Sequence, residues 1–135
     1  MSKTSIRLPK MTGQRLFIIS LVFAGLIQSA PSHAADEAER GREVAVQHCS
    51  RCHVIPDHNP TGGIGSTPSF SLLARLNDGL ERFETFFDRR PHPSFVRVAG
   101  VEPPTQLPVA LEPVELRIED IDAITAYAKK LRAAQ

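Results

Sequence analysis

The stretch Cys49-Ser50-Arg51-Cys52-His53 decides how the rest of this 135-residue chain is interpreted. Residues three and four apart on a helical turn lie on one face, so both thiols and the imidazole can contact the same ligand. Cys49 and Cys52 are the only cysteines of the chain. The pentapeptide therefore predicts a single site, built by one turn of chain.

Three chemistries use two thiols and an imidazole at this spacing. Haem can be attached covalently, with each thiol bonded to a vinyl group and the imidazole of His53 bound to the iron. A dithiol redox site is expected beside a strand and helix of thioredoxin type, which the sequence does not indicate. A structural zinc needs four ligands, and without a third cysteine His48, His53 or His58 would have to complete the set at unusual spacing. We favour haem and keep the other two open.

The pentapeptide resembles the attachment motif of c-type cytochromes, and the likeness to the small soluble class extends over most of residues 36–133. In that class a glycine stands eight residues before the first cysteine, where the last helix crosses, and Gly41 occupies this position. Ala45 replaces the aromatic residue often found four positions later. Tyr127 is similar to the aromatic residue of the family's closing helix, and we expect it close to Gly41. The resemblance implies an all-α fold of the class I cytochrome c type, with about four helices and long loops wrapped around one covalently bound haem c.

Residues 1–34 are predicted to be a cleaved export signal. A basic segment ends at Arg15, an apolar run follows, and Ser32-His33-Ala34 is a small-x-small cleavage site. The apolar run has 12 residues, whereas a helix needs about 20 to cross a bilayer, so a permanent anchor is less favoured. We expect cleavage after Ala34, a mature domain at 35–135 and a periplasmic location, where the resemblance places covalent haem attachment. Whether Met1 or Met11 is the start stays open.

Charge separates the two parts of the chain. All 15 acidic residues follow residue 34, whereas 4 of the 16 Lys and Arg residues precede it, which leaves the domain a net charge of −3. A mildly acidic surface without a basic stripe is repelled by phosphate. Nucleic acid is therefore not an expected partner.

Hydrophobic periodicity predicts helices on both sides of a loop-rich middle. Asp36 is the predicted N-cap of the first helix, and Ser69 or Ser71 can cap a short one. A phenylalanine-rich helix is expected to run on to Pro91, which ends it. The last helix presents one apolar face and has acids at its start and bases at its end. The predicted helices are 36–48, about 69–76, 80–90 and 118–133.

Two stretches show no period and are predicted to be loops. Residues 54–68 are expected to wrap the proximal side of the haem. The resemblance implies a proline carbonyl there that accepts a hydrogen bond from the axial histidine and fixes its ring. Pro68 is the candidate, with Pro56 and Pro60 as alternatives. Residues 91–117 contain six prolines and are expected to cover the distal face, with an extended segment near 95–98 but no sheet.

The sixth iron position is where this chain departs from the family. Many relatives carry His-Pro-x-Met-Pro before the closing helix and bind iron through the methionine. Residues 92–96 read His-Pro-Ser-Phe-Val, so Phe95 stands in the methionine position, and the only methionines, Met1 and Met11, lie in the predicted signal. His92 is the candidate ligand, beside an open or water-bound iron, and His58 is a third possibility.

The resemblance implies a periplasmic mono-haem electron carrier rather than an enzyme, and the sequence shows no catalytic constellation. One alternative is a haem-based ligand-binding or sensing module with an open sixth position. Another is an accessory electron-transfer subunit of a periplasmic dehydrogenase complex. Expected partners are redox proteins, such as a dehydrogenase, an oxidase or another cytochrome, with no stable membrane insertion after signal cleavage.

Overall fold

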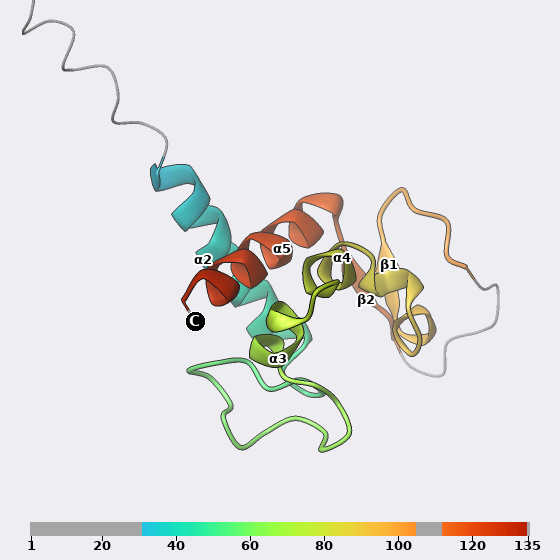
Figure 1. The fold of residues 1–135 in the computed structure, drawn as a ribbon. Helices are drawn as coiled ribbons and strands as arrows, with labels where there is room; N and C mark the ends of the chain where they lie inside the picture. The colour runs from blue at the N-terminus through green and yellow to red at the C-terminus, as the bar shows by residue number, and fades with distance from the viewer. Residues whose placement is uncertain (1–30, 105–111, 135) are drawn as a thin grey trace, which may run out of the picture. The chain divides into compact units, whose positions relative to one another are not determined.

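The computed structural model describes residues 31–104 and 112–134 and is mostly helical there (Figure 1). The prediction of a mostly helical chain is confirmed at this level. Two 3₁₀ turns and two short strands join the helices. In chain order the elements are α2 (Pro31–His48), α3 (Phe70–Arg75), α4 (Gly79–Glu84), η1 (Phe86–Asp88), η2 (His92–Ser94), β1 (Val96–Val98), β2 (Val114–Leu116) and α5 (Ile118–Ala133).

Helix α2 begins earlier than the sequence predicts. Asp36 is not its N-cap, because the helix starts at Pro31 and Asp36 lies within it. Proline suits the first helical turn, since its missing N–H would have no partner in the helix there. The expected cleavage site, Ser32-His33-Ala34, falls at the start of this helix. Residues 1–30 of the expected signal lie outside the described residues.

Helices α2 and α5 cross at Gly41 (Figure 1). A Cβ atom at Gly41 would lie 1.8 Å from the carbonyl oxygen of Ala123 and 2.9 Å from the nitrogen of Ile124. Only glycine lets the two backbones approach this closely, so the expected close passage of the last helix is confirmed. Tyr127 lies about one turn further along α5, buried in the same cluster as Ala45.

A buried carboxylate connects the start of α5 to α2. Asp120 accepts hydrogen bonds from the backbone N–H of Arg117 (2.9 Å) and from Nη1 of Arg40 (2.9 Å). Burial alone would raise the pKa of Asp120, but the hydrogen bonds from Arg117 and Arg40 outweigh it and the pKa is lowered. Asp120 therefore caps the helix from its third residue, although Arg117 stands at the N-cap position.

The short helix α3 is held at both ends. Ser69 caps it as predicted, because its Oγ accepts from the backbone N–H of Leu72 at 3.1 Å. At the other end Arg132 of α5 donates from Nε to the carbonyl of Ala74 (2.6 Å) and from Nη2 to the carbonyl of Leu76 (2.5 Å). The last carbonyls of a helix have no donor within the helix, and the guanidinium of Arg132 supplies donors to them.

The phenylalanine-rich helix is shorter than predicted. It ends at Glu84, and residues 86–88 form the 3₁₀ turn η1. The hydroxyl of Thr85 donates to the carbonyl of Glu81 at 2.7 Å. Such local bonds from a β-branched hydroxyl compete with regular helix geometry.

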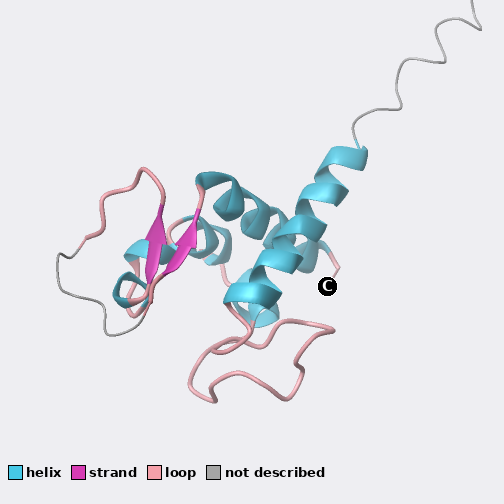
Figure 2. Cartoon of the chain, turned by 180° about the vertical axis from the view of Figure 1, so that it is seen from behind, coloured by secondary structure: helices cyan, strands magenta, loops and turns pink. Residues whose placement is uncertain are grey.

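The expectation of no sheet after residue 91 is wrong. Strands β1 and β2 pair in parallel, with Val96 opposite Val114 and Val98 opposite Leu116 (Figure 2). Three residues are too few to show an alternating pattern, and the partner strand follows a proline-rich stretch. The pair buries Val96, Val98 and Leu116 with Ile121 of α5 in one hydrophobic cluster.

A second hydrophobic cluster lies among α2, α3, α4 and α5. Its buried members are Ala45, Ile55, Phe70, Ala74, Phe83, Ile124, Tyr127 and Ala128. We call it the helical cluster, and the one around β1 and β2 the strand cluster. None of the described helices is long and apolar enough to cross a membrane.

Candidate functional site

The predicted site is a single turn that follows the C-terminal end of α2. The backbone N–H of Cys49 donates to the carbonyl of Ala45 (2.9 Å), which continues the helical pattern. The carbonyl of Cys49 accepts from the N–H groups of Cys52 (3.1 Å) and His53 (2.8 Å). The side chains of Cys49, Cys52 and His53 line one cavity, as their spacing predicts.

This cavity has a volume of about 510 Å³, within the range of roughly 300–1,000 Å³ typical of small-molecule and cofactor sites. Its wall includes residues of the loop before α3 and of both hydrophobic clusters. Most of its side chains are apolar, so it suits a large and mainly apolar ligand. The apolar lining residues are Ile64, Pro68, Phe70, Leu73, Phe83, Phe86, Pro91, Phe95, Val96, Val114, Leu116 and Ile124.

The imidazole of His53 is held in one tautomer. Its Nδ1 lies 2.7 Å from the carbonyl oxygen of Pro68, and because a carbonyl can only accept, Nδ1 carries the hydrogen and Nε2 keeps its lone pair. Pro68, rather than Pro56 or Pro60, is thus the proline that bonds to this ring. Burial lowers the pKa of His53, which the hydrogen bond to Pro68 only partly opposes. Phe70 packs edge-on against the ring, with centroids 5.5 Å apart.

His92 has the same arrangement on another part of the chain. Its Nδ1 lies 3.0 Å from the carbonyl oxygen of Arg89, so this Nδ1 is also the donor and Nε2 is again left with its lone pair. Burial lowers the pKa of His92, and the nearby His53 adds to this, whereas backbone hydrogen bonds to Arg89 and Phe86 oppose it. Phe86 packs edge-on against the ring at 5.2 Å, and Phe95 lies tilted at 5.8 Å.

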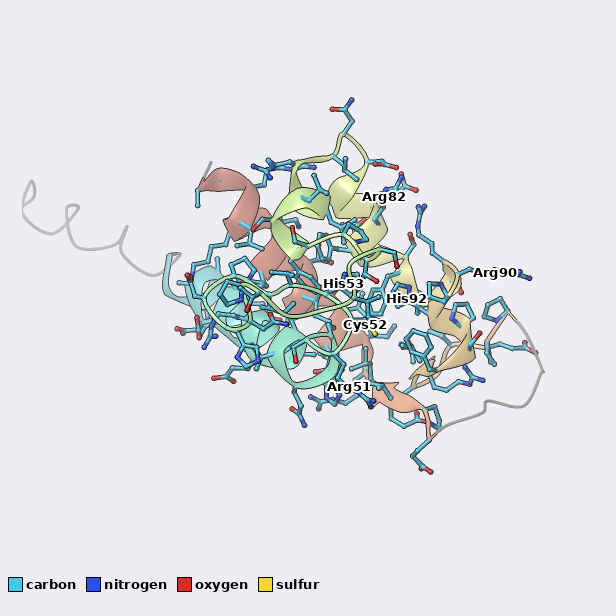
Figure 3. All side chains as sticks on the ribbon, turned by 90° about the horizontal axis from the view of Figure 1, so that it is seen from below. Arg51, Cys52, His53, Arg82, Arg90 and His92 are labelled. Carbon is cyan, nitrogen blue, oxygen red and sulfur yellow. The ribbon has the colours of Figure 1, made fainter. Side chains whose placement is uncertain are left out.

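The two imidazoles lie near each other in the cavity (Figure 3). Their centroids are 6.1 Å apart, and their planes differ by 6°. His58, the third candidate from the sequence, is exposed and is not part of the cavity wall. The fold therefore brings His92 to the motif and leaves His58 outside.

Cys49 does not have the raised acidity of a reactive redox cysteine. Burial, with a smaller contribution from neighbouring Cys52, raises the pKa of Cys49 to about 12. Reactive cysteines of Cys-x-x-Cys redox sites have lowered pKa values instead, because the thiolate is the nucleophile. Cys49 stays a protonated thiol at neutral pH.

The donor set fits haem better than a metal held by side chains alone. A structural zinc takes four protein ligands, and no group of three or more His, Cys, Asp or Glu residues that could hold a metal is found within 31–104 and 112–134. A porphyrin supplies four nitrogens to its iron, so the protein need provide only the axial ligands. The imidazole of His53, with Nδ1 bonded to a carbonyl, has the form of such a ligand.

Asn59 is a site residue that the sequence analysis missed. Its Nδ2 donates to the carbonyls of Ser50 (2.8 Å) and His53 (3.0 Å), and its Oδ1 accepts from the N–H of Ile55 (2.7 Å). The only signal in the sequence is an asparagine before Pro60 in a turn-rich stretch, since such residues commonly bond to nearby backbone. Asn59 holds the loop against the motif.

Three arginines, Arg82, Arg89 and Arg90, contribute to the cavity wall. Arg82 pairs with Asp78 (2.8 Å), and Arg89 pairs with Glu81 (2.8 Å). The third, Arg90, has an exposed side chain. No pattern in the sequence indicates these residues, because scattered arginines have no characteristic spacing. Since Arg82 and Arg89 are each paired with a carboxylate, Arg90 is the cation that the wall offers to a ligand with anionic groups.

No family model matches this chain, and the comparisons with curated proteins and with solved structures give no significant match either.

Proposed function

We propose that this chain is a mono-haem c-type cytochrome that carries single electrons. One observation carries the proposal: two cysteine thiols and an imidazole whose Nε2 keeps its lone pair line the same cavity of about 510 Å³. Cys49 and Cys52 would hold the haem through thioether bonds. Each bond would form by addition of S–H across a vinyl double bond, so no group leaves and no oxidant is needed.

When bound, the haem would supply an iron that gains or loses one electron. The residues of the chain hold and shield this group. Pro68 fixes the ring plane of His53 and increases the basicity of its Nε2 through the Nδ1–H bond. The phenylalanines of the wall exclude water, and the exposed guanidinium of Arg90 would be available to the carboxylates of a haem.

Two features support the finer assignment to a class I cytochrome c-like fold. The crossing of α2 and α5 at Gly41 corresponds to the helix crossing of that class. The second feature is the loop after the motif, in which the carbonyl of Pro68 accepts a hydrogen bond from His53, as the family's proline does for its axial histidine. The short parallel strands are a departure from a purely helical expectation.

Location and partners belong to the same proposal. Export by residues 1–34, with cleavage after Ala34, places the domain in the periplasm, where this kind of attachment takes place. Its partners would be other redox proteins, for example a dehydrogenase, an oxidase or another cytochrome. Charges on the two surfaces increase the rate at which such partners associate more than they increase the affinity of the complex.

The test is whether haem stays with the chain when it is denatured. The full chain, produced with a c-type haem attachment system, should give a haem-stained band on denaturing electrophoresis. The double variant Cys49→Ala, Cys52→Ala should give the same band by antibody and no haem stain. His58→Ala is a matched control that should stain like the wild type, because His58 lies outside the cavity wall. An unstained wild-type chain, or a stained double variant, would refute the proposal.

A further inference from the structure

His53 and His92 have the same hydrogen-bond arrangement, and it is one that is typical of metal-binding histidines. Both rings place Nδ1 at hydrogen-bond distance from a backbone carbonyl, 2.7 Å for His53 and 3.0 Å for His92. Histidines that bind metals usually donate their other ring N–H to a carbonyl, a carboxylate or water, which fixes the tautomer and the ring plane. Each ring is thus left with one lone pair, on Nε2, and both rings line the same cavity.

The spacing of the rings matches two ligands on opposite sides of one metal. A metal–nitrogen bond of about 2.0–2.1 Å on each side places the two imidazole centroids roughly 6 Å apart. The observed distance is 6.1 Å, with planes only 6° from parallel. Offset aromatic stacks cover the same range of distances, but a stack does not require that both rings direct Nδ1 to a carbonyl.

His92 is held in place by its neighbours along the chain. Pro91 and Pro93 flank it and restrict the backbone on both sides. Phe86 contacts the imidazole edge-on, and Phe95, the residue in the position of the family's methionine, lies against the same ring. Phenylalanine has no donor atom for iron, so Phe95 supports the ring of His92 instead of binding.

We propose that Nε2 of His92 is the second axial ligand, so that the iron is held between two imidazoles with no exchangeable position. The proposal rests on the proposed function and adds the coordination of the same site. This coordination favours an electron carrier over a ligand sensor, because an iron bound by two protein ligands has no open position for a small molecule. Two imidazole ligands also place the reduction potential below that of a methionine-ligated relative.

The test uses the purified holoprotein and spectroscopy rather than activity. The ferric wild type should be low-spin, without the near-infrared band of iron–methionine bonding, and the ferrous form should not change its spectrum under carbon monoxide. In His92→Ala the ferric iron should become high-spin and the ferrous form should bind carbon monoxide completely. Added imidazole should return this variant to the low-spin spectrum. His58→Ala should behave as the wild type.

Two outcomes would overturn the proposal. One is a wild-type protein that is high-spin or binds carbon monoxide at once. This measurement refutes the proposal even if the His92→Ala chain does not fold. The other is a folded His92→Ala protein with an unchanged low-spin spectrum, which would assign the sixth position to another residue. Both leave the haem covalently attached, so they are distinct from failure of the proposed function, in which the wild-type chain carries no haem at all.

Discussion

At the scale of single residues, Asn59 does more for the site than its surface loop suggests. One amide satisfies two carbonyls, those of Ser50 and His53, and one N–H, that of Ile55. These groups flank the turn that carries both thiols and the imidazole of His53. The position of His53 therefore depends on a side chain that does not line the cavity.

We predict that Asn59→Ala destabilises the holoprotein by about 1–3 kcal/mol, because three backbone groups lose their partner. Asn77→Ala is the control: its side chain is exposed in the turn between α3 and α4, and surface changes of this kind stay within about 0.5 kcal/mol. Urea unfolding followed by far-ultraviolet circular dichroism measures both. Equal midpoints for the two variants would show that Asn59 does not hold the loop.

The residues of the site could be predicted to different degrees. Cys49, Cys52 and His53 follow from spacing alone, because one helical turn places them together. Pro68 and His92 needed the family resemblance, since nothing local indicates which proline or histidine will reach the motif. Asn59 could not be found, because a hydrogen-bond hub leaves no periodic pattern.

At the scale of elements, the crossing of α2 and α5 permits no side chain at Gly41. The Cβ of an alanine would overlap the carbonyl oxygen of Ala123, at 1.8 Å, and this atom belongs to backbone rather than to a flexible side chain. The helices would have to separate. Both helices carry residues of the cavity wall, His48 at the end of α2 and Ile124 on α5, so a separation of the helices would alter the site.

Gly41→Ala should therefore lower the free energy of unfolding by about 1–3 kcal/mol or more, the usual range for overpacking, in spite of the higher helix propensity of alanine. Gly65→Ala provides the control, because a Cβ at Gly65 would meet nothing within 4 Å. Thermal unfolding of the two holoproteins gives the comparison. A Gly41→Ala protein as stable as the wild type would mean that the helices do not approach as described.

Long helices were easier to predict than short elements. The range 118–133 was predicted as the structure has it, because four turns give a clear apolar face. The 3₁₀ turns and the strand pair were not predicted, since each has only three residues. The parallel pairing of β1 with β2 depends on tertiary burial of Val96, Val98 and Leu116, which no local pattern reveals.

At the scale of the whole molecule, the helical cluster and the strand cluster both contribute to the wall of the cavity. Phe83 and Ile124 of the first cluster and Val96 and Leu116 of the second line the same cavity. When no ligand fills this cavity, its mainly apolar side chains face water, which lowers the stability of the fold by about 25 cal/mol for each Å² of apolar surface left exposed.

On the proposed function, we predict that the chain without haem does not keep this fold. The double variant Cys49→Ala, Cys52→Ala, purified without cofactor, should retain part of its far-ultraviolet helical signal, lose cooperative thermal unfolding and bind a hydrophobic dye. The wild-type holoprotein is the control and should unfold cooperatively without dye binding. A cofactor-free chain with the melting temperature of the holoprotein would contradict the prediction.

The contact between Arg40 and Asp120 joins residues 80 positions apart. This separation in sequence affects the order in which parts of the chain fold. Contacts so distant in sequence form late, because a long segment of chain must first close. The motif at 49–53 is made well before α5, so its thiols stay accessible on an open chain until the last helix docks. On the proposed function, this interval is when the cofactor enters, and pulse-labelled chains should acquire haem before they become resistant to protease. If the chains became resistant to protease before they acquired haem, the folded core would have to open again to admit the cofactor.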